Sequence, residues 1–300
     1  MFVGTFLAIE NITENVNILL TGATGFTGLF FKQRSQAAGH SVWPLLADLT
    51  DKAAVAAEVA QAQPTAVVHL AAISFVGHAD EAAFYSVNVL GTLNLLAALT
   101  SLPVAPTKVL LASSANVYGN CDASPISETQ IAAPVNHYAA SKLAMEHMAL
   151  TYADRLPLVI TRPFNYTGSG QAPQFLIPKL VDHFARKADR IALGNLHVER
   201  EFNDVRMVCD VYLKLLTRGE DGEIYNVCSG KPYTLKHVVK TLEQITGHRM
   251  VVDVNPEFVR ANEVHRLCGN PAKLITALGS LDGWQLEETL RWMLDYASNS

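Results

Sequence analysis

Tyr138 and Lys142 stand four residues apart in the run Tyr-Ala-Ala-Ser-Lys. On a helix, this spacing places a phenol and an ammonium group on one face. A free phenol has a pKa near ~10 and exchanges protons poorly at neutral pH, but a neighbouring cation favours the phenolate and lowers that pKa. The pair is therefore equipped to protonate a carbonyl oxygen, or to deprotonate an alcohol, while a hydride moves. An ordinary amphipathic helix has the same spacing, so the surrounding elements must decide.

Short apolar strands alternate with helical segments through the first part of the chain. The predicted strands are 16–21, 41–46, 66–70, 108–113 and 157–162, and the predicted helices are 26–38, 52–61, 82–99 and 138–152. Regular alternation of this kind indicates an α/β protein with a doubly wound parallel sheet, the Rossmann arrangement.

After Pro163 the alternation loosens. Further strands are expected at 224–227 and 250–254, and further helices at 205–217, 236–246 and 286–296. We assign residues 16–165 and 204–228 to a dinucleotide-binding domain. Residues 166–203 and 229–300 are assigned to a smaller C-terminal α/β lobe that binds substrate over the carboxyl edge of the sheet.

A glycine-rich turn, Thr21-Gly22-Ala-Thr-Gly25-Phe-Thr-Gly28, follows the first strand and opens the first helix. Glycines let such a turn bring backbone N–H groups close to a pyrophosphate, and the helix N-terminus favours the negative charge. The tip of the second strand, residues 43–46, has neither an acid nor a base to read the ribose 2′ position. Asp48 follows it, either as a contact to the adenosine or as a helix-capping residue. The choice between NADH and NADPH stays open.

Composition excludes several classes of partner. The formal net charge is −5 and no basic block is present, which argues against nucleic-acid binding. The apolar runs are too short to predict a membrane span. Four scattered cysteines without a C-x-x-C pattern indicate reduced thiols, no metal site and a cytoplasmic protein.

These motifs together resemble the extended short-chain dehydrogenase/reductase family. The glycine turn, His69–Ala72, Asn88, Ser113-Ser114, Tyr138, Lys142 and Arg162–Asn165 follow one another in that family's order. The resemblance implies an NAD(P)H cofactor and a homodimer formed through the helices 82–99 and 138–152.

The resemblance also implies roles for individual residues. Tyr138 exchanges the proton, Lys142 binds the nicotinamide ribose and lowers the pKa of Tyr138, and Ser114 holds the reacting oxygen. Asn88 is expected to pin neighbouring backbone. The implied cofactor contacts are Gly22, Thr24, Gly25, Phe26, Thr27, Asp48, Leu49, Leu70, Ala71, Ala72, Tyr138, Lys142 and Arg162.

Within that family, the second half is similar to the GDP-mannose 4,6-dehydratases and, more closely, to the GDP-4-keto-6-deoxy-D-mannose reductases. The similar segments are 163–168, 194–204, 225–230 and 260–264. Guanidinium groups suit a diphosphate because they are planar and always charged, and a carboxylate suits ribose hydroxyls. The substrate-binding residues implied are Ser114, Asn165, Lys179, Asn195, Arg200, Arg260 and Glu263.

Asn116 separates the chain from the dehydratases, which need a carboxylate two residues beyond the catalytic Ser/Thr. An amide has no proton to exchange at neutral pH. We therefore expect simple reduction of the C4 ketone of GDP-4-keto-6-deoxy-D-mannose, giving GDP-D-rhamnose or GDP-6-deoxy-D-talose in deoxysugar and cell-surface polysaccharide biosynthesis. Three alternatives remain: a nucleotide-sugar epimerase that keeps its NAD, a 4,6-dehydratase, and a non-catalytic regulatory protein that binds a dinucleotide.

Overall fold

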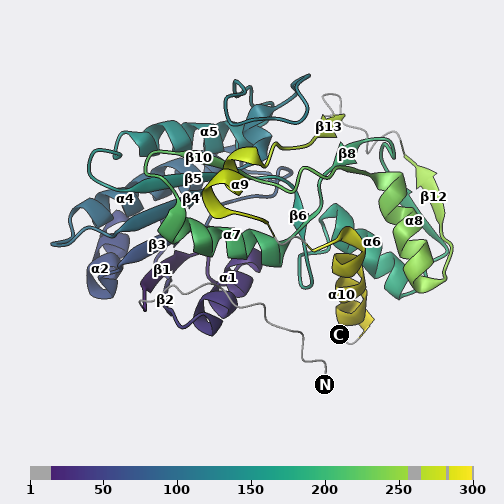
Figure 1. Ribbon diagram of the computed structural model, residues 1–300, viewed down its shortest axis with the longest axis horizontal. Coiled ribbons are helices and arrows are strands. Elements are labelled where there is room, and N and C mark those ends of the chain that lie inside the picture. The colour runs from purple at the N-terminus through teal and green to yellow at the C-terminus, as the bar shows by residue number, and fades with distance from the viewer. Residues whose placement is uncertain (1–14, 256–264, 282–283, 299–300) are drawn as a thin grey trace.

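Six parallel strands form the central sheet of the protein (Figure 1). The computed structural model describes residues 15–255, 265–281 and 284–298. Along the sheet the strand order is β2-β1-β3-β4-β5-β10. The strands are β1 (Asn17–Thr21), β2 (Ser41–Leu45), β3 (Ala66–His69), β4 (Lys108–Ala112), β5 (Leu158–Pro163) and β10 (Ile224–Val227). The doubly wound parallel sheet is confirmed, and each predicted strand lies within two residues of its expected bounds.

Helices cover both faces of this sheet, as Figure 1 shows. Alternate strand residues supply the two apolar layers, because side chains along a strand point to opposite faces. One layer joins Ile18 and Leu20 to helices α1 (Phe26–Ala37), α7 (Val205–Arg218) and α9 (Ala272–Leu278). The other joins Leu19 to helices α2 (Lys52–Ala62), α4 (Thr92–Thr100) and α5 (His137–Leu150).

The long helix predicted over 82–99 is confirmed and runs from Glu81 to Thr100, with a π-helical turn in its middle. Its parts are α3 (Glu81–Tyr85), a π-helical turn η1 (Ser86–Gly91) and α4. Wide turns of this kind occur mostly as single insertions, often at functional sites. The turn contains buried Asn88, and Gly91 packs against Leu49 so closely that an added Cβ would lie 2.8 Å from the Leu49 Cβ. By length and composition alone, the segment Glu81–Thr100 could cross a membrane, but here its inward face packs against α2 and α5.

Besides α7 and α9, the described part of the second half adds small sheets and the helices α6, α8 and α10. Strand β8 (Glu199–Arg200) pairs with β11 (Tyr233–Thr234) and β13 (Arg266–Leu267), β7 (Arg190–Leu193) pairs with β12 (Val251–Val254), and β6 (Tyr166–Thr167) pairs with β9 (Asn203–Asp204). Helices α6 (Leu176–Ala185), α8 (Leu235–Thr246) and α10 (Leu286–Ser298) pack together around their own apolar cluster. Helices α6 and α9 and the short strands β6, β7, β8, β9, β11 and β13 were absent from the sequence prediction. The proposed boundaries between the two domains stay a prediction.

Asp204 fastens the C-terminal helix to the sheet domain. It is buried, caps α7 by accepting from the Arg206 N–H at 2.8 Å, and forms an ion pair with the Arg206 guanidinium at 2.7 Å. The Thr289 hydroxyl of α10 donates to the same carboxylate at 2.7 Å. The guanidinium also lies 3.6 Å from the ring centroid of Trp284 and 3.9 Å from that of Trp292. A cation held between two indoles gains from both ring faces.

We predict that Asp204→Asn lowers the free energy of unfolding by about 3 kcal/mol, because it leaves a half-buried arginine without its counter-charge. Urea denaturation followed by circular dichroism measures this loss. The matched control is Glu287→Gln, which breaks an exposed ion pair with Arg291 and should cost less than about 1 kcal/mol. Equal losses in the two variants would contradict the assignment.

Candidate active site

Tyr138, Lys142 and Ser114 converge at the carboxyl end of β4. Helix α5 begins after Asn136, whose side chain caps it by accepting from the Ala139 N–H at 2.9 Å. Tyr138 and Lys142 are both buried on α5, and the Lys142 Nζ donates to the Ala112 carbonyl, the last residue of β4, at 2.7 Å. Ser114 follows β4, its hydroxyl accepts from the Asn116 N–H at 3.2 Å, and its interaction with Tyr138 lowers the pKa of that phenol. Ligands of open α/β sheets bind at this edge.

Burial dominates the protonation of the two acid-base groups. It raises the pKa of Tyr138, and the hydrogen bond to Ser114 offsets this only in part. Burial also lowers the pKa of Lys142 to about 8, against the raising effect of the nearby Glu146 carboxylate. The Lys142 ammonium donates to the Ala112 carbonyl, and the expectation that it lowers the pKa of Tyr138 stays a prediction. The phenol is therefore protonated at neutral pH, as a proton donor must be.

Glu146 and Arg162 form a buried ion pair behind Lys142. The guanidinium Nε and Nη2 donate to the two carboxylate oxygens at 3.0 and 2.6 Å, and the guanidinium lies 4.9 Å from the Tyr118 ring centroid. The predicted cofactor contact of Arg162 stays a prediction, and its guanidinium already donates two hydrogen bonds to Glu146. Glu146 was not selected from the sequence, although it continues the helix face of Tyr138 and Lys142 by one more turn.

His69 links the phosphate turn to the helix that follows β3. Its Nδ1 lies 2.7 Å from the Thr21 hydroxyl and its Nε2 lies 2.8 Å from the Thr92 hydroxyl. Thr92 donates its own proton to the Asn88 carbonyl at 2.8 Å, so it accepts from an Nε2–H. Nδ1 is then the acceptor of the Thr21 proton. Burial and the positive charge of Lys142 lower the pKa of His69 to about 3, which keeps the ring neutral.

The Asn88 carboxamide continues this network to the catalytic helix. It accepts from the Ile73 N–H at 2.9 Å and donates to the Ile73 carbonyl at 3.1 Å, which confirms that Asn88 pins backbone. It also donates to the Ser141 hydroxyl at 3.0 Å, and Ser141 donates to the Tyr138 carbonyl at 2.8 Å. Buried hydrogen bonds therefore run without a break from the phosphate turn to Tyr138.

The glycine turn has the shape that a dinucleotide diphosphate requires. Gly22 has φ +68°, and a Cβ there would lie 2.8 Å from the Ala71 backbone nitrogen. A Cβ on Gly28 would lie 2.1 Å from the Gly22 carbonyl oxygen. Helix α1 starts after Gly25 with no capping side chain among the described residues. Its first N–H groups can therefore bind an anion, and the residues present fit a nicotinamide dinucleotide.

Other predicted cofactor residues lie around this turn. Thr24 is exposed and Phe26 half-buried, with its ring stacked on Tyr166. The Thr27 hydroxyl is 2.8 Å from the Tyr166 hydroxyl. Asp48 is exposed and accepts from the Thr50 N–H at 2.9 Å, whereas Asp51 caps α2, so the helix-capping alternative for Asp48 is wrong. The remaining residues near the turn are buried Leu49 and half-buried Leu70, Ala71 and Ala72.

The predicted substrate residues other than Ser114 belong to the part of the chain that follows β5. Asn165 is exposed directly after β5, and its carbonyl accepts from the Asn203 N–H at 2.9 Å. Arg200 is half-buried on β8, and the Lys179 Nζ on α6 donates to the Ala192 carbonyl at 3.2 Å. Asn195 accepts from the His197 N–H at 2.9 Å. Arg260 and Glu263 lie outside the described residues.

Glu201, which sequence reasoning missed, holds the Arg200 segment in place. Its fully buried carboxylate accepts from the backbone N–H groups of Ser229 at 2.7 Å, Gly230 at 3.2 Å and Gly269 at 2.6 Å. These donors belong to segments that follow β10 and β13. The signal in the sequence was its place between Arg200 and Asp204, inside a segment already singled out.

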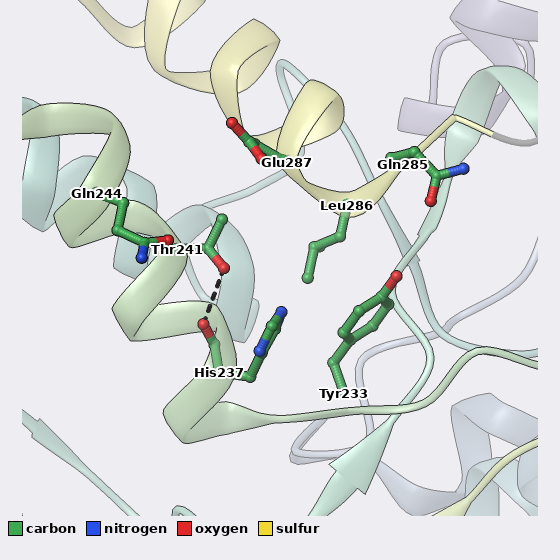
Figure 2. Close-up of a pocket in the computed structure, with 7 residues that line it drawn as sticks. All are labelled: Tyr233, His237, Thr241, Gln244, Gln285, Leu286 and Glu287. Carbon is green, nitrogen blue, oxygen red and sulfur yellow. Dashed lines mark hydrogen bonds between the residues drawn. The ribbon is translucent and has the colours of Figure 1, made fainter.

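A pocket of about 200 Å³ lies elsewhere, between α8 and α10 in the C-terminal lobe (Figure 2). Tyr233 and His237 stack in it with ring centroids 5.2 Å apart, and the Thr241 hydroxyl donates to the His237 carbonyl at 3.0 Å. None of the predicted catalytic, cofactor or substrate residues lines it.

Comparison with known proteins shows the family of this chain. The family model described as GDP-mannose 4,6 dehydratase matches residues 44–293. A GDP-6-deoxy-D-talose 4-dehydrogenase from Aggregatibacter actinomycetemcomitans is 36% identical over 88% of this chain and 92% of its own length. A GDP-6-deoxy-D-mannose reductase from Pseudomonas aeruginosa is 35% identical over 92% of this chain and 94% of its own length.

Solved structures of similar proteins have the same fold as this chain. A protein from Burkholderia cenocepacia, provisionally described as an epimerase, is 49% identical and superposes with a TM-score of 0.91 over 95% of this chain and 99% of its own. RMD from Pseudomonas aeruginosa, solved with NADPH, is 33% identical and superposes with a TM-score of 0.87 over 95% of this chain and 98% of its own.

The neutral state of His69 makes stability depend on pH. Its pKa in the folded chain, about 3, lies below the ordinary value of 6.5, so the unfolded chain binds more protons between these values. We predict that this group's contribution is complete above pH 6.5 and is lost as the pH falls towards 3, at up to about 1.4 kcal/mol per pH unit. The slope of unfolding free energy against pH measures it. His69→Gln should flatten that slope and exposed His197→Gln should not, and an unchanged slope in His69→Gln would refute the assignment.

Proposed function

The chain belongs to the GDP-mannose 4,6 dehydratase family, and from that membership we propose that it reduces the C4 ketone of a GDP-linked 4-keto-6-deoxyhexose with NAD(P)H. It is then an NAD(P)-dependent oxidoreductase. One observation carries the proposal: Ser114, Tyr138 and Lys142 meet at one sheet edge, while Asn116 stands where dehydration needs a carboxylate.

The chemistry divides between cofactor and chain. A reduced nicotinamide dinucleotide, when bound at the glycine turn, would supply the hydride, and the chain supplies the proton. The hydroxyls of Ser114 and Tyr138 bind the ketone oxygen, and Tyr138 then donates its proton to the oxygen as negative charge develops there. The Lys142 ammonium stabilises the phenolate left behind. Both side chains are almost wholly buried, so this charge is stabilised in a site of low dielectric.

On the substrate side, we assign Arg200 and Arg260 to the diphosphate and Glu263 to the ribose of the nucleotide. Asn165, Lys179 and Asn195 complete the proposed set. The product is GDP-D-rhamnose or GDP-6-deoxy-D-talose, according to which face of the ketone meets the nicotinamide. The two enzymes named among the relatives act on these two C4 configurations.

A second candidate function is nucleotide-sugar epimerisation, which the description of the Burkholderia cenocepacia protein favours. An epimerase returns the hydride to the same sugar and keeps its cofactor. Purified protein with tightly bound NAD and no net cofactor oxidation would support this function instead.

We also propose a homodimer in the cytoplasm. Helix α5 and the η1–α4 segment expose Met148 and Leu90, which are 43% and 58% accessible, as a seam between two copies would require. All four cysteines are free thiols, which suits a reducing compartment.

We predict that Tyr138→Phe lowers kcat/KM for reduction of GDP-4-keto-6-deoxy-D-mannose by roughly 10³-fold, because the proton donor is lost. The absorbance of the reduced cofactor measures the rate, and NMR gives the C4 configuration of the product. Tyr152→Phe, beyond the far end of α5, should keep the wild-type rate. No cofactor oxidation by wild-type protein with GDP-, dTDP- or UDP-linked keto-sugars would refute the function.

The pH dependence of the reaction should report on Lys142. Below its pKa of about 8 the side chain is a cation, and as the pH rises through that value it loses the charge. We predict that kcat/KM is constant below pH 8 and declines above it. Lys142→Arg keeps the charge at high pH and should move the decline upward, whereas Lys142→Met should be slow and show no decline near pH 8. A wild-type profile that is flat to pH 10 would exclude this role.

A further inference from the structure

We propose that the chain binds NADH in preference to NADPH, and that the carboxylate of Glu58 sets this preference. The inference rests on the proposed function only in taking a nicotinamide dinucleotide as the ligand of the glycine turn. It concerns the adenosine end of that ligand, where the two cofactors differ by one phosphate on the ribose 2′ oxygen.

The sheet topology places that ribose beside β2. With the pyrophosphate at the N-terminus of α1, the adenosine half extends past the tip of the strand that follows α1. In this sheet β2 is the edge strand next to β1. It ends at Leu45, and α2 begins at Lys52. The groups that read the 2′ position therefore come from the connection 46–51 and from the helices beside it.

Glu58 already occupies the backbone donors of this connection. From the second turn of α2, its carboxylate accepts from the Leu46 N–H at 3.0 and 3.1 Å and from the Ala47 N–H at 2.8 Å. These are the first two N–H groups past the end of β2, and Pro44, within β2, has none. A 2′ phosphate that sought these donors would meet a carboxylate instead.

The exposed charge around this connection is predominantly negative. Residues 39–51 contain no lysine or arginine, and they include the exposed Asp48 and Asp51. His40 supplies no cation, since burial lowers its pKa. On α1, Arg34 is paired with Asp210 of α7. Lys52, at the start of α2, is an exposed cation that the two neighbouring aspartates outnumber.

The same groups suit a free ribose. A carboxylate has about four lone-pair positions, so Glu58 and Asp48 can each accept a hydroxyl proton while keeping their present bonds. The 2′ hydroxyl of NADH is such a donor, and the 2′ phosphate of NADPH has only acceptors at neutral pH. RMD from Pseudomonas aeruginosa was solved with NADPH. The preference for NADH therefore follows from the residues of this chain's connection 46–51 and not from its relatives.

The test is equilibrium binding of NADH and of NADPH to the purified full chain, followed by cofactor fluorescence without sugar at ~0.15 M ionic strength, where exposed charges still interact over about 8 Å. We expect a Kd for NADH at least tenfold below that for NADPH. Equal affinities, or tighter NADPH binding, would overturn the inference while leaving the proposed function standing. If neither cofactor binds, the proposed function fails with it.

Three variants localise the effect. Glu58→Gln keeps an oxygen for the Leu46 and Ala47 N–H groups but removes the charge, so NADPH should bind at least fivefold tighter and NADH within twofold of wild type. Glu243→Gln on α8 is the matched control and should change neither Kd. Asp48→Arg, at an exposed position, should reverse the preference. A ratio of affinities unchanged in both Glu58→Gln and Asp48→Arg would overturn the assignment to this connection.

Discussion

The neutral imidazole of His69 is the constraint on which the geometry of the site depends. It joins the Thr21 hydroxyl, at the end of β1, to the Thr92 hydroxyl on α4. The Leu70 and Ala71 N–H groups also donate to Thr21, at 3.1 and 3.0 Å, so its oxygen is fully used. In a buried network, each donor needs its acceptor, because an unpaired polar group there is costly. A charged ring would place an Nδ1–H donor against the Thr21 hydroxyl, whose own proton would then lose its acceptor. The phosphate turn, the loop after β3 and the catalytic helix therefore hold their positions together.

Burial has opposite consequences for the two catalytic side chains, and both suit reduction. It stabilises the neutral phenol of Tyr138 and weakens the ammonium of Lys142. The Glu146 carboxylate, one turn further along α5, partly restores that ammonium, and its own charge is balanced by Arg162. The phenol is neutral before the reaction, and the ammonium stabilises the negative charge that develops on it as the proton leaves. The side chains of α5 thus provide both a neutral proton donor and a cation that stabilises the phenolate.

Sequence reasoning reached the parts of the site that local rules determine. Alternating strands and helices gave the sheet, and because the carboxyl ends of parallel strands share one edge, Ser114 after β4 was expected near the helix of Tyr138 and Lys142. It missed the parts that depend on which elements become neighbours. Three such features join segments that are separated along the chain. They are the π-helical turn that carries Asn88, the ion pair of Glu146 with Arg162, and the hydrogen bonds from the Leu46 and Ala47 N–H groups to Glu58. Helix α6 was missed although Ile177, Leu180, Val181 and Phe184 form a buried face, and Pro178 lies in its first turn, where proline is tolerated.

The direction in which the pKa of Tyr138 shifts could not be predicted from the sequence either. The spacing shows that a cation is near the phenol, but it does not show where the hydrogen bonds of that cation go. The same limit applies to the reductase and epimerase alternatives, which share Ser114, Tyr138 and Lys142. They differ in the fate of the cofactor, since a reductase exchanges it in every turnover and an epimerase keeps it. In both reactions Asn116 stands where dehydration needs a carboxylate. Net oxidation of the reduced cofactor in each turnover is therefore the property that separates a reductase from an epimerase built on the same three side chains.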